Sequence, residues 1–266
     1  MQENIKNFMT RRGDGLITYT LSGAEYWRQR GISADRVLPY LNTIDVEGLR
    51  EAGARVTEQQ LLKAKQQLGL VGKQVLIFSG RLYAEKKVDF LLRAFALLQG
   101  RRTDVALLVL GNGPERAKLE ALKSQLQLRH VEFLGEENDP DRVSVFFKLA
   151  DMLLIPGLVG LAIVHGFAYG LPIATTDHGY HSPEIEYLSS ENGVFTPHEE
   201  NAYAQAIGNV LAYPPRLRSM QIAAATMANR LTLKDSTARF LGAINGFLSP
   251  PNTIRTDLMF PGKTDS

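Results

Sequence analysis

The stretch that decides the fold is IPGLVGLAIVHGFAYGLPIATTD, residues 155–177. An apolar run leads into a turn with Gly157 and Gly160, a helical pattern follows, and a second apolar run covers residues 173–176. A strand, a glycine turn, a helix and a strand in this order place backbone N–H groups around a phosphate. The stretch therefore predicts a phosphate-binding turn, next to a helix on which His165 is the one side chain with acid–base chemistry.

Strand-like and helical patterns alternate on both sides of this stretch. Strands are predicted at residues 75–80, 105–113, 131–135, 152–157 and 172–177, and helices at 87–99, 114–128, 140–150, 201–213, 216–230 and 233–248. Continuous apolar strands that alternate with helices indicate a parallel sheet covered on both faces. The predicted fold class is therefore α/β, with a Rossmann-like parallel sheet.

The first sixty residues do not continue this alternation. A strand is predicted at residues 15–20, a helix at 22–31 with Ser22 as its N-cap, and a short strand at 36–42. So small a set of elements cannot bury a core by itself. We expect it to be the end of another domain, followed by a connecting segment, or an extension that packs on the main domain.

Composition excludes several classes of protein. The chain has 266 residues, a formal net charge of +2 and no cysteine, so it offers no disulfide and no thiolate metal ligand. A charge this small does not predict a nucleic-acid-binding or membrane-binding surface. No apolar run approaches the roughly 18 residues of a membrane span, and the first residues lack the apolar core of a signal peptide. The expected location is the cytoplasm, including the inner face of the membrane.

Glycine turns follow three of the predicted strands, at residues 79–81, 111–114 and 157–160. One such turn is common in any parallel sheet, but the carboxyl ends of parallel strands meet in one crevice. Three turns together favour a nucleotide-like ligand in that crevice.

Two basic residues stand near the first of these turns. Arg81 directly follows a strand, and Lys86 precedes the next helix. A guanidinium and an ammonium at the crevice can neutralise a diphosphate. The alternative is that Lys86 and Lys87 are solvated and that Arg81 pairs with Glu85.

Five motifs, in order and in register, carry a resemblance to a known family. They are FSGRLYAEKKVDFLLRAFALL (78–98), LLVLGNGPERAKLEAL (107–122), VEFLG (131–135), ADMLLIPG (150–157) and GLPIATTD (170–177). Together they resemble the carboxyl half of glycosyltransferase family 4, whose members are retaining sugar-nucleotide transferases of the two-domain GT-B architecture. The resemblance runs from about Gly15 to Leu248 and implies that the chain contains the donor-binding half.

The resemblance also implies roles for particular residues. Arg81 and Lys86 match the catalytic basic pair that binds the donor diphosphate and stabilises the leaving nucleotide. The remaining matches are to donor-binding positions: Gly80 before Arg81, Gly111 and Gly113 near the nucleoside, Phe133 and Leu134 at the base, Gly160 and Leu161 at the sugar and phosphate, His165 at the ribose, and Glu184 after the next strand.

Two positions depart from the family pattern. Members commonly have two glutamates eight positions apart, of which the first contacts the donor sugar and the second the ribose; here these positions are Gly157 and His165. A histidine can hydrogen-bond a ribose hydroxyl, whereas Gly157 has no side chain to hold a sugar. The alternative for His165 is a structural histidine that faces the sheet.

The length of the chain is a further departure from the family pattern, because the acceptor-binding domain of such enzymes exceeds a hundred residues. The resemblance implies a remnant of that domain at residues 1–41, a connection at 42–60, the donor-binding domain at 61–248 and a flexible tail at 249–266. A second chain could supply the missing domain.

The expected function is hexosyl transfer from a UDP- or GDP-sugar to an unidentified glycan, lipid or other acceptor, incomplete in this chain alone. The nucleotide sugar is a substrate, with no tightly bound cofactor, no metal and no nucleic acid expected. The alternatives are a non-catalytic nucleotide-sugar-binding subunit that needs a partner chain, and an epimerase or phosphorylase of the same architecture.

Overall fold

A computed structural model describes residue 10 and residues 12–248 of the chain. It divides into two compact units, one of residues 1–43 with 231–266 and the other of residues 44–230. The predicted flexible tail at residues 249–266 lies outside the described residues. Each unit is built around its own sheet.

The larger unit contains a six-stranded, entirely parallel sheet with the strand order β5-β4-β3-β6-β7-β8. The strands are β3 (Gln74–Ser79), β4 (Val105–Leu110), β5 (Val131–Gly135), β6 (Met152–Leu154), β7 (Ile173–Asp177) and β8 (Gly193–Pro197). The chain builds outward from β3 to β5, returns to pair β6 with β3, and continues outward to β8. The winding therefore reverses between β3 and β6, which is where ligands bind in open sheets of this kind.

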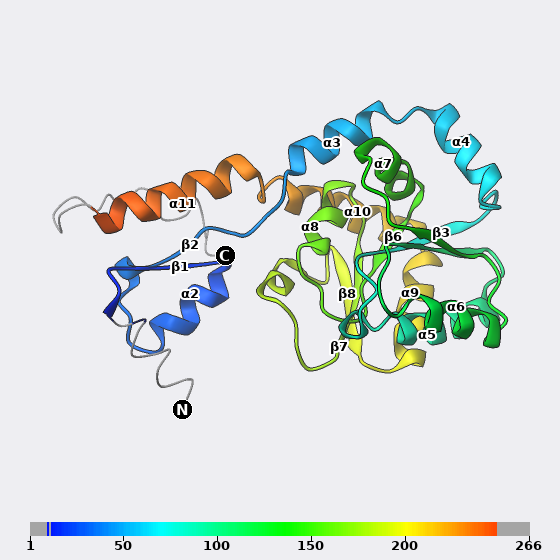
Figure 1. The fold of residues 1–266 in the computed structure, drawn as a ribbon, viewed down its shortest axis with the longest axis horizontal. Helices are drawn as coiled ribbons and strands as arrows, with labels where there is room; N and C mark the ends of the chain where they lie inside the picture. Colours follow the sequence, from blue (N-terminus) through cyan, green and yellow to red (C-terminus); the bar gives the residue numbers. More distant parts are fainter. Residues whose placement is uncertain (1–9, 11, 249–266) are drawn as a thin grey trace. The chain divides into compact units, whose positions relative to one another are not determined.

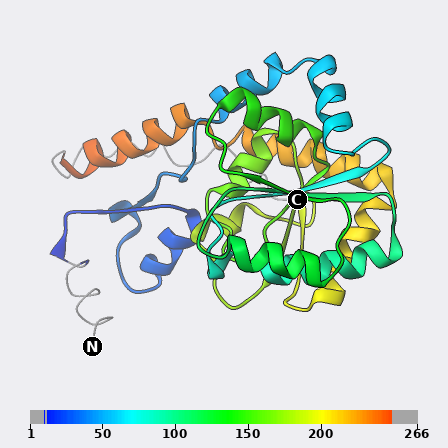
Figure 2. The same cartoon turned by 45° about the vertical axis from the view of Figure 1, so that its right-hand side comes forward.

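Helices cover both faces of this sheet, as Figures 1 and 2 show. The α-helices of the unit are α3 (Val46–Arg55), α4 (Glu58–Gln67), α5 (Val88–Arg101), α6 (Arg116–Gln125), α7 (Pro140–Leu149), α8 (Ala162–Ala168), α9 (Glu200–Leu211) and α10 (Pro214–Ala228). Two 3₁₀ helices, η2 (Ala84–Lys86) and η3 (Pro183–Tyr187), lie in loops at the carboxyl ends of β3 and β7. The predicted α/β sheet with helices on both faces is confirmed.

The core on one face comes from strand residues that point toward α5, α6 and α9. Fully buried Phe78, Leu107 and Val109 pack there with Phe95 of α5 and with Tyr203 of α9. Continuous apolar runs in β3 and β4 produce this burial, because both faces of a parallel sheet are covered. The Tyr203 hydroxyl donates a hydrogen bond to the Ala174 carbonyl at 2.8 Å, which satisfies its one buried polar atom.

The smaller unit contains the parallel pair β1 (Leu16–Thr18) and β2 (Val37–Pro39), with α2 (Leu21–Arg28), the 3₁₀ helix η1 (Ala34–Arg36) and α11 (Leu233–Leu248). Its buried centre is small and consists of Ala24, Ile32 and Val37. The ring of Phe240 on α11 packs edge-on against Tyr40 at 5.5 Å. The structure thus groups α11 with β1 and β2, whereas the sequence-based division placed it with the donor-binding domain.

Local differences from the sequence-based expectations have simple causes. Thr20, not the predicted Ser22, is the N-cap of α2, because its side-chain oxygen accepts from the Gly23 N–H at 3.3 Å. The connecting segment contains α3 and α4, and α4 begins with a capping box formed by Thr57 and Gln60. Strand β8 was not predicted, since its sequence GVFTP lacks a continuous apolar run.

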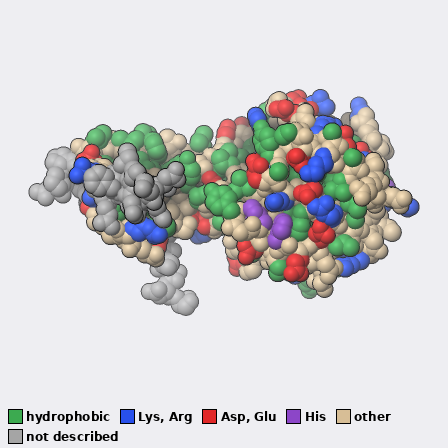
Figure 3. All heavy atoms as spheres, turned by 60° about the horizontal axis from the view of Figure 1, so that its bottom comes forward, with side chains coloured by type: hydrophobic (Ala, Val, Ile, Leu, Met, Phe, Trp, Pro, Cys, Tyr) green, Lys and Arg blue, Asp and Glu red, His purple; other side chains and the backbone are tan. Residues whose placement is uncertain are grey.

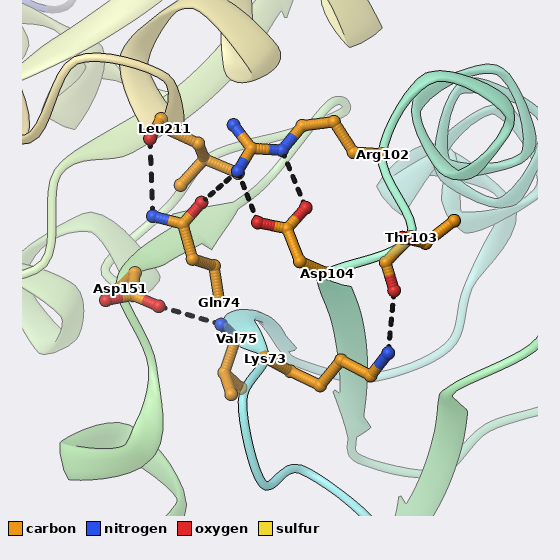
Figure 4. Close-up of polar contacts among 8 residues, drawn as sticks. All are labelled: Lys73, Gln74, Val75, Arg102, Thr103, Asp104, Asp151 and Leu211. Atoms are coloured by element: carbon orange, nitrogen blue, oxygen red, sulfur yellow. Dashed lines mark hydrogen bonds and ion pairs between the residues drawn. The ribbon is translucent and has the colours of Figure 1, made fainter.

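A polar network joins the amino ends of the strands, at the edge opposite the glycine turns (Figure 4). Arg102 binds Asp104 through two hydrogen bonds and also donates to the side-chain oxygen of Gln74 at 2.6 Å. The carboxylate of Asp151 accepts from the Val75 N–H at 2.7 Å. Burial raises the pKa of Asp151. These contacts link the amino ends of β3, β4 and β6.

Candidate functional site

The candidate site lies at the carboxyl edge of the larger sheet, around the reversal between β3 and β6. A cavity of about 480 Å³ opens there. Its lining residues are Ser79, Gly80, Arg81, Tyr83, Leu110, Gly111, Asn112, Gly113, Glu136, Glu137, Val143 and His165. The structure therefore brings together five of the predicted residues, namely Gly80, Arg81, Gly111, Gly113 and His165. Tyr83, Glu136 and Glu137 were not predicted from the sequence.

Gly111 and Gly113 allow the loop after β4 to approach the loop after β3 closely. A Cβ atom on Gly113 would lie 2.6 Å from the carbonyl oxygen of Leu82, and one on Gly111 would overlap the carbonyl of Gly80. The Leu82 N–H donates to the Asn112 carbonyl at 2.9 Å, which holds the loops together. Any side chain at these positions would force the β3 and β4 loops apart and change the cavity floor.

Arg81 is an exposed cation at the cavity. Its Nη1 donates to the Tyr83 hydroxyl at 3.3 Å. This hydrogen bond, and secondarily the charge of Glu136, raise the pKa of Arg81 above its ordinary value. The partner of Arg81 is thus Tyr83 and not Glu85, and within the described part of the chain most donors of its guanidinium have no acceptor.

Lys86 does not line the cavity but approaches the glycine turn after β6. Its Nζ donates to the carbonyl oxygen of Leu158 at 2.7 Å. The side chain is partly buried, and burial lowers the pKa of Lys86. Lys86 is therefore not the solvated surface lysine of the alternative interpretation.

His165 lies on α8 with its ring stacked on Phe147 of α7, at 4.2 Å between centroids and an interplanar angle of 7°. Burial lowers its pKa to about 4, so the ring is neutral at physiological pH. Within the described residues, its Nε2 is buried and has no hydrogen-bond partner. His165 lines the cavity, so its ring is a candidate contact for a bound ligand.

Gly157 is packed against the backbone of η2. A Cβ at this position would lie 2.6 Å from the carbonyl carbon of Lys86 and would overlap the carbonyl oxygen of Glu85. The Leu158 N–H donates to the same Glu85 oxygen at 3.0 Å. A glutamate cannot occupy position 157 unless η2 moves, so the glycine and the position of Lys86 depend on each other.

The other predicted residues do not line the cavity. Gly160, with a φ of 58°, donates its N–H to the Ser182 hydroxyl at 2.8 Å. Leu161 is the N-cap residue of α8, and Glu184 is buried in η3. Phe133 and Leu134 lie on β5, and the Phe133 side chain packs against the core.

Three further histidines gather beside the turn at Gly157, and Figure 3 shows histidine side chains at the surface on this face. The rings of His178 and His181 are 4.5 Å apart, and His198 is 6.1 Å from His178. The pKa of His178 is lowered by burial and by His181. Sequence reasoning missed this group, because His198 joins it only through the pairing of β7 with β8. Among the residues that the structure describes, no group of three or more His, Asp or Glu side chains could hold a metal ion.

Comparison with known proteins identifies the family. Residues 62–227, more than half of the chain, match the family model described as Glycosyl transferases group 1. The chain belongs to this glycosyltransferase family. The GDP-mannose-dependent alpha-(1-6)-phosphatidylinositol dimannoside mannosyltransferase of Mycobacterium tuberculosis is 30% identical over 147 residues, 54% of this chain and 37% of that protein. D-rhamnosyltransferase WbpZ of Pseudomonas aeruginosa is 28% identical over 155 residues, 56% of this chain and 39% of that protein.

Among solved structures, Anabaena Alr3699/HepE in complex with UDP has a TM-score of 0.75 and 20% identity, over 92% of this chain and 68% of that one. This likeness shows that the two chains share a fold. The matched segments span well under half of the curated relatives' lengths. In the described part of this chain, no helix has the length and apolar character needed to cross a membrane.

Proposed function

We propose that this chain is the donor-binding half of a retaining glycosyltransferase that moves a hexosyl unit from a UDP- or GDP-sugar to a glycan or lipid acceptor. The observation that carries the proposal is the cavity at the sheet reversal. It combines the Arg81 guanidinium, the close-packed glycines Gly111 and Gly113, and the neutral His165. A nucleoside diphosphate needs cations for its phosphates and neutral hydrogen-bonding groups for its ribose.

In the proposed reaction, the bond from the anomeric carbon to the donor diphosphate breaks and a bond to an acceptor hydroxyl oxygen forms with the same configuration, while the proton of that hydroxyl passes to an oxygen of the departing diphosphate. Negative charge grows on the departing diphosphate. We assign the stabilisation of that charge to Arg81 and Lys86; the position of Arg81 at the cavity and the approach of the Lys86 Nζ to the Gly160 turn support this assignment. Positioned cations stabilise such charge best where water is partly excluded, as around Lys86.

His165 is the proposed ribose contact. Its Nε2 is free of other hydrogen bonds within the described residues, and stacking on Phe147 holds the ring in place. A neutral imidazole can accept from, or donate to, a ribose hydroxyl. This role suits the lowered pKa of His165, since a charged ring is not required.

Glu136 favours guanine over uracil as the base. Its exposed carboxylate lines the cavity at the end of β5. Neighbouring Glu137 is already paired with Arg142 at 3.0 Å. Guanine presents adjacent N1–H and 2-amino donors to the two acceptor oxygens of a carboxylate, whereas the single N–H of uracil stands between carbonyl oxygens that a carboxylate repels.

Calorimetric titration with UDP and GDP tests the proposal. We expect the chain to bind GDP more tightly, and Arg81→Ala with Lys86→Ala together to weaken binding by at least about a hundredfold, since two charge-assisted contacts are lost. Lys73→Ala is the matched control, because Lys73 lies at the opposite edge and donates to the Thr103 carbonyl. A folded chain that binds neither nucleotide at millimolar concentration would refute a donor site.

A non-catalytic role as a nucleotide-sugar-binding subunit is favoured by one observation, the absence of a side chain at Gly157 to hold the sugar. The two roles differ in turnover. A subunit would bind the nucleotide but neither transfer nor hydrolyse the sugar when an acceptor-binding partner domain is supplied, whereas the proposed enzyme would turn over under those conditions.

A further inference from the structure

The backbone N–H of Gly160 is held by a side chain from another loop. Ser182 lies between the end of β7 and the start of η3, and its Oγ accepts from the Gly160 N–H at 2.8 Å. Because the amide can only donate, the serine oxygen is the acceptor and its own proton remains for another partner. Within the described residues, the structure gives that hydroxyl proton no acceptor.

Lys86 approaches the same turn, and among the residues that the structure describes its ammonium donates one hydrogen bond. Its Nζ lies 4.0 Å from the place that a Cβ atom of Gly160 would take. One proton of the ammonium is used by the Leu158 carbonyl at 2.7 Å, and an ammonium has three protons. The Lys86 ammonium and the Ser182 hydroxyl therefore both lie beside the Gly160 turn.

The backbone around Ser182 holds its hydroxyl in place. Ser182 has an extended conformation, with φ −69° and ψ 159°, as expected for a residue followed by a proline. The Ser182 carbonyl accepts the N–H of Ile185 at 3.1 Å, which fixes the start of η3. The hydroxyl thus needs little reorganisation to meet a ligand.

We propose that Ser182 binds the sugar-bearing β-phosphate of the donor, a step that rests on the proposed donor site. The Gly160 N–H donates to Ser182 Oγ, and the Ser182 hydroxyl donates to a phosphate oxygen beside the Lys86 ammonium. A phosphate suits this place because its oxygens are acceptors and carry negative charge, whereas both available groups are donors. The amide polarises the hydroxyl and so strengthens its hydrogen bond to the anion.

Calorimetry with paired nucleotides tests this assignment. UDP and GDP carry the β-phosphate, whereas UMP and GMP lack it. We expect Ser182→Ala to weaken diphosphate binding about tenfold and monophosphate binding less than about twofold, as one lost hydrogen bond to a charged group implies. Ser182→Thr keeps the hydroxyl and should restore most of the diphosphate affinity.

Ser189→Ala is the matched control, because the Ser189 hydroxyl also accepts a backbone N–H, from Glu191 at 3.3 Å, but lies after η3. It should leave all four affinities unchanged. Equal losses of mono- and diphosphate affinity in Ser182→Ala, with a lowered melting temperature, would show that Ser182 only supports the turn and would overturn the proposal. Unchanged affinities would overturn it too and leave the donor site standing, whereas no nucleotide binding by the unaltered chain would refute both.

Discussion

At the scale of single residues, packing against the η2 backbone explains why position 157 is a glycine. Gly157 stands where the resemblance described above implies a glutamate, and the backbone of Glu85 and Lys86 occupies the space that a side chain would need. The position of Lys86 near the Gly160 turn depends on that contact. A sugar contact at position 157 and this path of η2 therefore exclude each other.

Gly157→Ala should destabilise the protein by about 1–3 kcal/mol, because the added methyl group overpacks against the η2 backbone. It should also weaken nucleotide binding, since Lys86 moves with η2. Chemical denaturation and calorimetry measure the two effects. Gly100→Ala is the control: no atom lies within 4 Å of its Cβ position, so alanine in α5 should be neutral or slightly stabilising. A stable Gly157→Ala variant with full affinity would contradict this packing account.

The pKa of His165 makes a second prediction at this scale. Burial lowers the pKa from 6.5 to about 4 in the folded state, so below pH 6.5 the unfolded chain binds a proton that the folded chain does not. Stability should therefore be lost as the pH falls from 6.5 towards 4, by at most about 3 kcal/mol from this residue. Denaturation of the unaltered chain and of His165→Gln across this range measures the difference, which should shrink with falling pH; a constant difference would exclude the effect.

At the scale of secondary-structure elements, the two edges of the larger sheet carry different features. The carboxyl edge carries the glycine turns, η2 and η3, whereas the amino edge carries the network of Figure 4. There, Asp151 and Arg102 tie β3, β4 and β6 by side-chain hydrogen bonds. The amino edge should therefore govern stability, with little influence on nucleotide binding.

Asp151→Ala tests this division. It removes the acceptor of the Val75 N–H, a partly buried bond of 2.7 Å, and should cost about 1–3 kcal/mol in the free energy of unfolding. Asp104→Ala is the comparison, because the Arg102–Asp104 pair is more exposed and its loss should cost under about 1 kcal/mol. Thermal or denaturant unfolding gives both values. Nucleotide affinity should remain that of the unaltered chain, and a large loss in Asp151→Ala would show that the edges are coupled.

At the scale of the whole molecule, all candidate site residues fall within one compact unit. Residues 44–230 contain the six-stranded sheet, both helix layers and the cavity. The other unit has a two-stranded sheet and a small buried centre. Two strands with so few buried residues are marginal by themselves, so the larger unit should provide most of the stability.

A fragment of residues 44–230 should fold cooperatively and bind nucleoside diphosphates with the affinity of the full chain. The reason is that its core and its site are complete without the smaller unit. Circular dichroism on heating and calorimetry are the measurements, with the Arg81→Ala, Lys86→Ala fragment as the non-binding control. An unfolded fragment would show that the smaller unit is needed for stability of the larger one.

The amino-acid sequence by itself determined the sheet strands from β3 to β7, because fully buried parallel strands are continuous apolar runs. It also located the glycine turns, since close backbone approach leaves few residue types to choose from, and so predicted that Gly80, Arg81, Gly111 and Gly113 share one crevice. The prediction that His165 contacts the ligand came only from the resemblance to a known family. Strand β8 could not be predicted from the sequence, because its mixed composition leaves no periodic signal.

Contacts between residues far apart in the chain were decided only by the tertiary structure. Ser182 reaches Gly160 across 22 positions, His198 joins His178 through the β7–β8 pairing, and α11 packs with β2 although more than 190 residues separate them in the chain. The packing of Gly157 against the backbone of Glu85 and Lys86 is likewise a contact between residues far apart in the chain. A local pattern records what each segment buries, but not which distant backbone or hydroxyl comes to lie against it.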